Sequence, residues 1–148
     1  MTTPPTPYAS DAEIEAIAKG FMDLALPKAA WTHAAHFATA IWLIRRRPDI
    51  LLERDMPGMI RRYNESVGGV NSATSGYHET ITLASIRATR AFLAAEPGDR
   101  ALHESHAALM AGPCGDKDWL FAYWSRDLLM SVEARRIWVE PDIIPFPF

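Results

Sequence analysis

The 148-residue chain has few of the features that mark several other classes of protein. Its one cysteine, Cys114, cannot form an internal disulfide, which predicts a reducing, cytoplasmic location. The apolar stretch 37–44 ends at Arg45 and is far shorter than the ~20 residues of a membrane span, so we expect no membrane partner. The start of the chain lacks the basic and apolar regions of a signal peptide, and residues 1–9 are predicted to form a disordered tail.

The chain also has no excess of basic residues. Its 15 Lys and Arg are outnumbered by 18 Asp and Glu, which gives a formal net charge of −3. Proteins that bind nucleic acid usually carry a clustered basic face, so we expect no DNA or RNA partner. The length suits one domain, which we place at residues 10–148.

No segment shows the alternating pattern of a β-strand, and apolar residues recur at helical spacing instead. Capping residues, prolines and glycines set the expected helix ends. The expected helices run from Ser10 to Leu26, from about Ala29 to Arg46, from an Asp55 cap to Gly68, from His78 to Ala95 and from an Asp99 cap to Met110, with short helices after Asp116 and Ser131. The predicted fold is all-α: a bundle of four main helices, short C-terminal helices and an extended, proline-rich tail over residues 139–148.

Two histidines one helical turn apart, His33 and His36, lie in the most apolar part of the chain. Residues at i and i+3 share a helix face, so both rings can point at one place. A second polar cluster, His78-Glu79, opens the fourth expected helix. We therefore predict His33, His36 and His78 as ligands of a divalent metal such as zinc, iron or manganese, with His78 and Glu79 as catalytic residues.

Four further side chains are predicted to contact a small-molecule ligand. Tyr77 adjoins the second cluster, Asn64 lies on the third expected helix, and Trp31 precedes the histidine pair. Arg87 could bind a carboxylate of the ligand, although an exposed arginine on a helix is commoner.

Each of these motifs also has a plain structural explanation. Paired histidines often donate to backbone carbonyls, and either His33 or His36 could instead act as an acid or base without metal. The pair His103 and His106 has more polar surroundings, which favours a solvated helix face. Cys114 is expected to be a small side chain in a Gly/Pro turn.

Three segments together resemble those of a family of small bacterial proteins. They are Leu26-Pro27-x-x-x-Trp31-Thr32-His33-x-x-His36-Phe37, Gly76-Tyr77-His78-Glu79-Thr80-Ile81-Thr82 and Ser131-x-Glu133-Ala134-Arg135-x-x-x-Val139-x-Pro141-Asp142. The resemblance implies no particular activity, substrate or cofactor. It groups His33, His36, His78 and Glu79 in shared motifs and leaves His103 and His106 outside them.

Three functions remain open from the sequence. The first is a metal-dependent, hydrolase-like enzyme that acts on a small molecule through the histidines and Glu79. The second is a metal-free module that binds or senses a small molecule in an aromatic pocket. The third is a structural protein that forms a homodimer through its apolar tail, residues 143–148.

Overall fold

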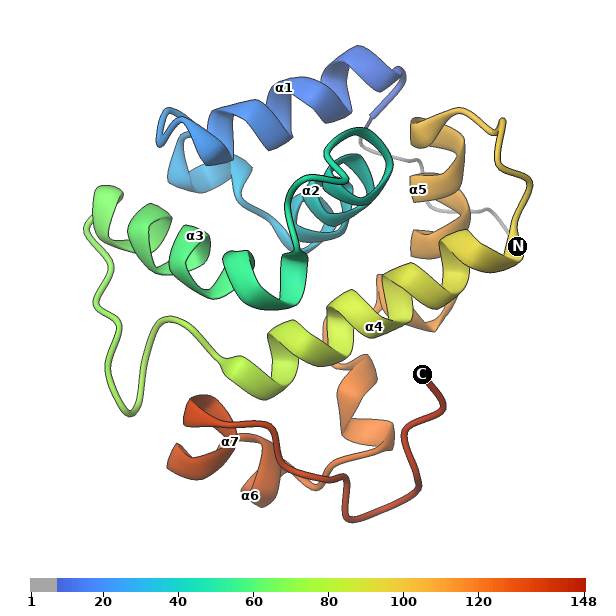
Figure 1. Cartoon of the computed structure of the whole chain (residues 1–148). Helices are drawn as coiled ribbons and strands as arrows, with labels where there is room; N and C mark the ends of the chain where they lie inside the picture. The colour runs from blue at the N-terminus through green and yellow to red at the C-terminus, as the bar shows by residue number, and fades with distance from the viewer. Residues whose placement is uncertain (1–7) are drawn as a thin grey trace.

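The computed structural model describes residues 8–148, and these contain helices and no β-strand (Figure 1). The all-α prediction is confirmed. The α-helices are α1 (Asp11–Met22), α2 (His33–Arg46), α3 (Leu52–Ser66), α4 (Glu79–Ala95), α5 (Leu102–Ala111), α6 (Arg126–Leu129) and α7 (Val132–Arg136), and three 3-10 turns are η1 (Lys28–Ala30), η2 (Pro113–Gly115) and η3 (Trp119–Ala122). Within the described range no helix is both long enough and apolar enough to cross a membrane.

Helix α2 lies at the centre of the fold, with contacts to α1, α3, α4 and α5 (Figure 1). Its residues 37–43 are all buried, because α2 is apolar on nearly every face and neighbours surround it. Most of the predicted N-terminal tail, residues 1–7, lies outside the described residues. Tyr8 is buried and its ring packs edge-on against His106, 5.1 Å between centroids.

Several helix ends follow from local capping chemistry. Ser10 accepts from the amide of Glu13 at 3.3 Å at the start of α1, and Ser131 accepts from that of Ala134 at 3.1 Å at the start of α7. Both caps were predicted and both are confirmed, because a cap depends on residues that are adjacent in sequence.

Two predicted helix starts are wrong. Helix α3 begins at Leu52 because the Asp55 carboxylate lies inside its first turn and accepts from the Leu51 amide at 3.1 Å, instead of standing before the helix. Pro57 is therefore inside the helix. Helix α5 begins at Leu102 with no side-chain cap, so Asp99 does not cap it.

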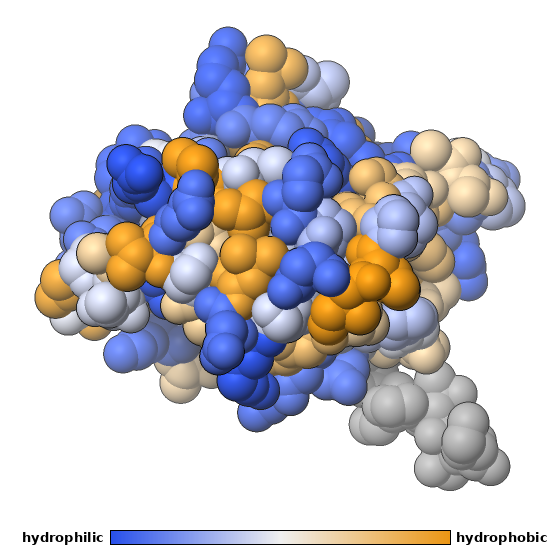
Figure 2. Space-filling model, turned by 90° about the horizontal axis from the view of Figure 1, so that it is seen from below, coloured by the Kyte–Doolittle hydropathy of each residue, from blue (hydrophilic) through white to orange (hydrophobic). Residues whose placement is uncertain are grey.

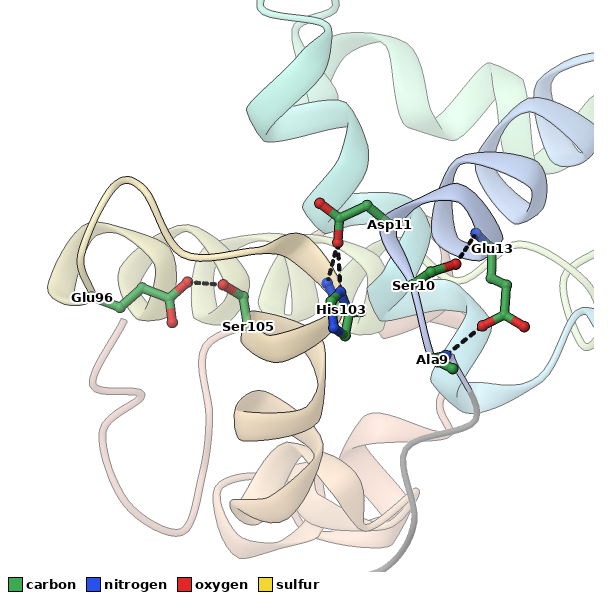
Figure 3. Close-up of polar contacts among 7 residues, drawn as sticks. All are labelled: Ala9, Ser10, Asp11, Glu13, Glu96, His103 and Ser105. Atoms are coloured by element: carbon green, nitrogen blue, oxygen red, sulfur yellow. Dashed lines mark hydrogen bonds and ion pairs between the residues drawn. The ribbon is translucent and has the colours of Figure 1, made fainter.

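Helix α5 is tied to the start of α1 by polar contacts (Figure 3). One Asp11 oxygen accepts from the His103 backbone amide at 2.9 Å and contacts the His103 Nδ1 at 2.8 Å. His106, one turn later, is fully buried and its Nε2 donates to the Ala34 carbonyl of α2 at 2.9 Å. The predicted solvated face is therefore wrong for His106, because α1 and α2 both cover that side of α5.

The C-terminal tail is extended, as predicted, and lies against the body. The Thr80 hydroxyl of α4 lies 2.8 Å from the Ala134 carbonyl and 2.9 Å from that of Ile137, and it accepts from the Val139 amide at 3.2 Å. Near the end of the tail, Phe146 packs in an aromatic cluster of Trp119, Tyr123, Trp124 and Trp138. These contacts join the last segment of the chain to α4.

Exposed apolar side chains concentrate near the C-terminal end of the chain. Figure 2 shows the face seen from below in Figure 1, where apolar side chains lie among polar ones. Those with more than two fifths of their surface exposed in this part of the chain are Met130, Val132, Ile137, Ile143, Ile144 and Phe148. Single exposed apolar residues are ordinary on protein surfaces.

Candidate functional site

A cavity of about 680 Å³ opens between α2, α3, α4 and the loop that joins α3 to α4. Its volume lies within the ~300–1,000 Å³ typical of small-molecule sites. Small side chains at Ala40 of α2 and Ser85 of α4 face this space, and larger side chains there would fill it. The loop supplies part of the wall through Gly69, Val70 and Gly76.

Aromatic rings form one wall of the cavity. Trp31 stacks on the buried Phe21, with ring centroids 4.4 Å apart and an interplanar angle of 8°, and lies 5.3 Å from Tyr63. The Tyr63 hydroxyl donates to the Leu26 carbonyl at 2.9 Å, so this phenol is already paired and presents its ring to the cavity. Such a wall suits an apolar or aromatic ligand.

His36 lines the cavity, and its imidazole has no hydrogen-bond partner among the described residues. Its ring lies 4.3 Å from that of Trp31, and neither ring nitrogen has a hydrogen-bond partner elsewhere in residues 8–148. The side chain is exposed and lines the cavity. Desolvation by the surrounding protein, and to a smaller extent the charge of His33, lowers its pKa from 6.5 to about 4. His36 is therefore neutral at pH 7, with one nitrogen able to donate and the other able to accept.

A hydrogen-bonded polar wall surrounds Tyr77. Its hydroxyl donates to Glu79 at 2.5 Å, and its backbone amide donates to the Asn71 side-chain oxygen at 3.0 Å. That oxygen also accepts from Asn64 at 3.1 Å, so two cavity residues share one anchor. Burial first, and then the Glu79 carboxylate, raise the pKa of Tyr77. The Tyr77 phenol is therefore un-ionised in the physiological range.

His78 lines the same cavity, but both of its nitrogens are occupied. Nδ1 accepts from the Ile81 amide at 3.1 Å and so caps α4, and Nε2 lies 2.7 Å from the Leu129 carbonyl. Because Nδ1 accepts, the proton must be on Nε2, which donates to that carbonyl. Burial lowers the pKa of His78, which keeps this ring neutral.

His33 faces a different, smaller cavity of about 100 Å³ that His36 also lines. Its Nε2 lies 2.7 Å from the Cys114 carbonyl. Cys114 itself is buried in the η2 turn, and burial raises the pKa of its thiol to about 11. A thiol with that pKa is not a nucleophile at neutral pH.

The remaining predicted residues divide between the cavity and the surface. Trp31, Asn64, Tyr77, His36 and His78 all line the larger cavity, and Glu79 contacts it through the Tyr77 hydroxyl. Arg87 does not line it, because its guanidinium lies 4.1 Å from the centre of the Trp138 ring near the tail.

The three predicted metal ligands, His33, His36 and His78, lie in different surroundings. In the described part of the chain, no group of three or more His, Cys, Asp or Glu side chains is arranged to hold a metal ion. Both nitrogens of His78 are occupied, whereas His33 keeps Nδ1 free and His36 keeps both nitrogens free among the described residues. In this arrangement two of the three predicted ligands have a nitrogen available to a metal.

The sequence did not predict the two charged residues of the cavity lining, Lys28 and Arg135. Lys28 lies in the turn before α2 and Arg135 in α7, more than 100 positions apart in sequence. Their only signals were an isolated lysine after Pro27 and the place of Arg135 in the third family-like segment.

Comparison of the chain with models of known protein families, with curated proteins and with solved structures gave no match. The resemblance to a family of small bacterial proteins therefore stays a prediction.

Proposed function

We propose that the protein binds a small apolar molecule in the cavity between α2, α3 and α4, without a metal. The observation that carries this proposal is a mostly apolar cavity of about 680 Å³ with aromatic rings on one wall and an unbonded imidazole, His36, beside them. Ligand sites commonly combine apolar walls with a few polar groups that set orientation. Binding or sensing is the class of function that this geometry supports best.

His36 supplies the orienting group in this proposal. A neutral imidazole that is free of partners can donate to or accept from a polar atom of the ligand. One such hydrogen bond contributes about 0.5–1.5 kcal/mol, which corresponds to a roughly two- to tenfold change in affinity. Tyr77 and Asn64 are held by internal hydrogen bonds and also line the cavity.

The metal-dependent hydrolase stays a prediction. Metal ligation at His78 would require one of its nitrogens to give up the Leu129 carbonyl or the Ile81 amide. Such a change costs one hydrogen bond, about 0.5–1.5 kcal/mol, whereas His33 can keep its contact with the Cys114 carbonyl because its other nitrogen is free among the described residues. A chelator arm in the binding experiment separates the two proposals.

We also propose a cytoplasmic location, supported by the one free, buried cysteine. The homodimer stays a prediction as well. Its surface would be the exposed apolar residues of the tail, Ile143, Ile144 and Phe148. Light scattering on the chain truncated after Asp142 tests it, and an unchanged oligomeric state would count against it.

The test of the proposed function is a thermal-shift screen of small aromatic and aliphatic molecules, with and without EDTA. A ligand at 100 times its Kd stabilises the folded state by about 2.7 kcal/mol, which raises the melting temperature by roughly 5–10 °C for a chain of this size. Ala40→Leu should remove the shift, because the larger side chain occupies the cavity. Ala16→Leu makes the same change on the exposed surface of α1 and should leave the shift intact.

Two results would overturn the proposal. One is the absence of any ligand whose stabilisation is lost in Ala40→Leu and kept in Ala16→Leu. The other is a shift that disappears with EDTA, since this would make the binding metal-dependent.

A further inference from the structure

The charged side chains that line the large cavity, Lys28 and Arg135, carry the same sign. Lys28 reaches it from η1 and Arg135 from α7, and none of the described residues that line it is Asp or Glu. The chain as a whole is acidic, with a formal net charge of −3. The positive lining is therefore a local feature and does not follow from the overall composition.

Lys28 is a cation of the cavity lining without a carboxylate beside it. Five other cations of the described residues do lie beside carboxylates; the pairs are Lys19 with Glu15, Arg47 with Asp49, Arg54 with Asp55, Arg90 with Glu53 and Arg100 with Glu96. Lys28 has no hydrogen bond or ion pair with any residue from 8 to 148. Its ammonium group is available to a ligand.

Arg135 is positioned without being neutralised. One of its terminal nitrogens donates to the Gly76 carbonyl at 2.8 Å and lies 3.4 Å from that of Tyr77. Carbonyl oxygens fix the direction of a guanidinium but leave its formal charge intact, and its other donors remain available. The carboxylate of Glu79 is outside the lining and already accepts from the Tyr77 hydroxyl.

Resting on the proposed function, we infer that the ligand is an apolar anion: an aromatic or aliphatic body with a carboxylate. The body contacts Trp31, Tyr63 and the apolar lining, and the carboxylate pairs with Lys28 or Arg135 at the edge. A cationic ligand would meet two like charges and no carboxylate in the lining, which disfavours it. Neutral His36 can donate a hydrogen bond to a carboxylate oxygen or accept one from a donor, so it is compatible with an anion.

The experiment compares molecules of one shape and different charge by calorimetric titration of the full chain. The probes are 2-naphthoate, its neutral carboxamide and 2-naphthylmethylammonium, with dodecanoate and dodecanol as the aliphatic pair. We expect the carboxylates to bind about tenfold more tightly than their neutral counterparts, and the ammonium compound most weakly. Added NaCl should weaken only the carboxylates, because salt screens charge pairs at an accessible rim.

Matched variants locate the source of the preference. Lys28→Gln and Arg135→Gln remove the two cavity cations, and Lys19→Gln removes a lysine that is paired with Glu15 on the surface. At least one cavity variant should reduce carboxylate affinity about three- to tenfold and leave carboxamide affinity unchanged, and Lys19→Gln should change neither. Arg135→Lys keeps the charge and serves as the control for the contact of Arg135 with Gly76.

The outcomes separate this inference from the function on which it rests. If carboxamide and dodecanol bind as tightly as the carboxylates, or if neither Lys28→Gln nor Arg135→Gln reduces the preference, the anion inference is overturned and binding in the cavity stands. If no probe binds wild type in a manner that Ala40→Leu abolishes, the proposed function fails as well. A preference shown by dodecanoate alone or by naphthoate alone identifies which apolar body the cavity accepts and supports the inference.

Discussion

Gly76 is the residue where backbone conformation and the cavity wall depend on each other. Its φ is +80°, a region that L residues with a side chain rarely adopt, and a Cβ there would lie 2.5 Å from the Asn71 side-chain oxygen and 2.6 Å from the Val70 carbonyl. Gly68 has nearly the same backbone, with φ +86°, and no atom within 4 Å of an added Cβ. The two glycines therefore separate conformational strain from steric contact.

We predict that Gly68→Ala costs about 1 kcal/mol, the typical cost of a left-handed alanine. Gly76→Ala carries the same strain and must also displace Asn71, whose oxygen accepts from Asn64 and from the Tyr77 amide. Each lost hydrogen bond is worth about 0.5–1.5 kcal/mol, so the total reaches about 2–4 kcal/mol.

Urea denaturation of both variants measures the difference, and ligand titration follows its functional consequence. Gly76→Ala should weaken ligand binding, because Asn64 and Tyr77 both line the cavity, and Gly68→Ala should not. Equal destabilisation by the two substitutions would refute the reasoning, since it would mean that Asn71 is not fixed by contact with Gly76.

Three more predictions concern stability. Thr80→Val should lower the free energy of unfolding, measured by urea denaturation, by about 1–3 kcal/mol, because the Thr80 hydroxyl joins α4 to α7 and the tail. Thr39→Val should be neutral or stabilising, since the buried Thr39 hydroxyl has no partner among the described residues. A larger loss of stability in Thr39→Val than in Thr80→Val would contradict this. Burial lowers the pKa values of His78 and His106 below 6.5, so below pH 6.5 the unfolded chain binds protons that the folded chain excludes. The free energy of unfolding should therefore be level above about pH 7 and fall as the pH drops from 6.5. A flat profile down to pH 5 would be inconsistent with the burial of these two rings. Phe146→Ala should lower the free energy of unfolding by about 1–3 kcal/mol, which is less than for a fully buried ring because Phe146 is half-buried. A change below about 0.5 kcal/mol would show that the tail does not pack against the body as described.

The elements that sequence predicted well are those whose signals are local. The caps at Ser10 and Ser131 lie within three residues of the amides that they bind, so the pattern alone defines them. The start of α3 was misplaced because Asp55 followed by Pro57 also resembles a helix beginning, and only the contact with Leu51 shows that the first turn has already started.

The candidate site was predicted only in part, for a similar reason. Spacing placed His33 and His36 on adjacent positions of one helix, but their partners come from distant parts of the chain. His33 contacts the Cys114 carbonyl, His78 contacts the Leu129 carbonyl, and His36 lines the cavity without such a partner. Which imidazole stays free depends on how the helices pack, and helical periodicity does not contain that information.

The cavity itself also depends on long-range packing. Its walls combine α2, α3, α4, a loop and α7, and its two cations come from opposite ends of the chain. For the same reason, the burial of His106 was not predicted. The residues just before His106 in sequence are polar, and the helices α1 and α2 that cover it come from a distant part of the chain.

The most direct test of ligand binding in the cavity is the indole N–H spectrum of the protein by NMR during titration with 2-naphthoate. The chain has five tryptophans, and of these Trp31 alone lines the large cavity in the described structure. Trp31→Phe assigns its signal by removing it. We predict that the Trp31 signal shifts with saturation while those of Trp42 and Trp138, which do not line the cavity, stay in place. An unmoved Trp31 signal at ligand concentrations that stabilise the protein would contradict it.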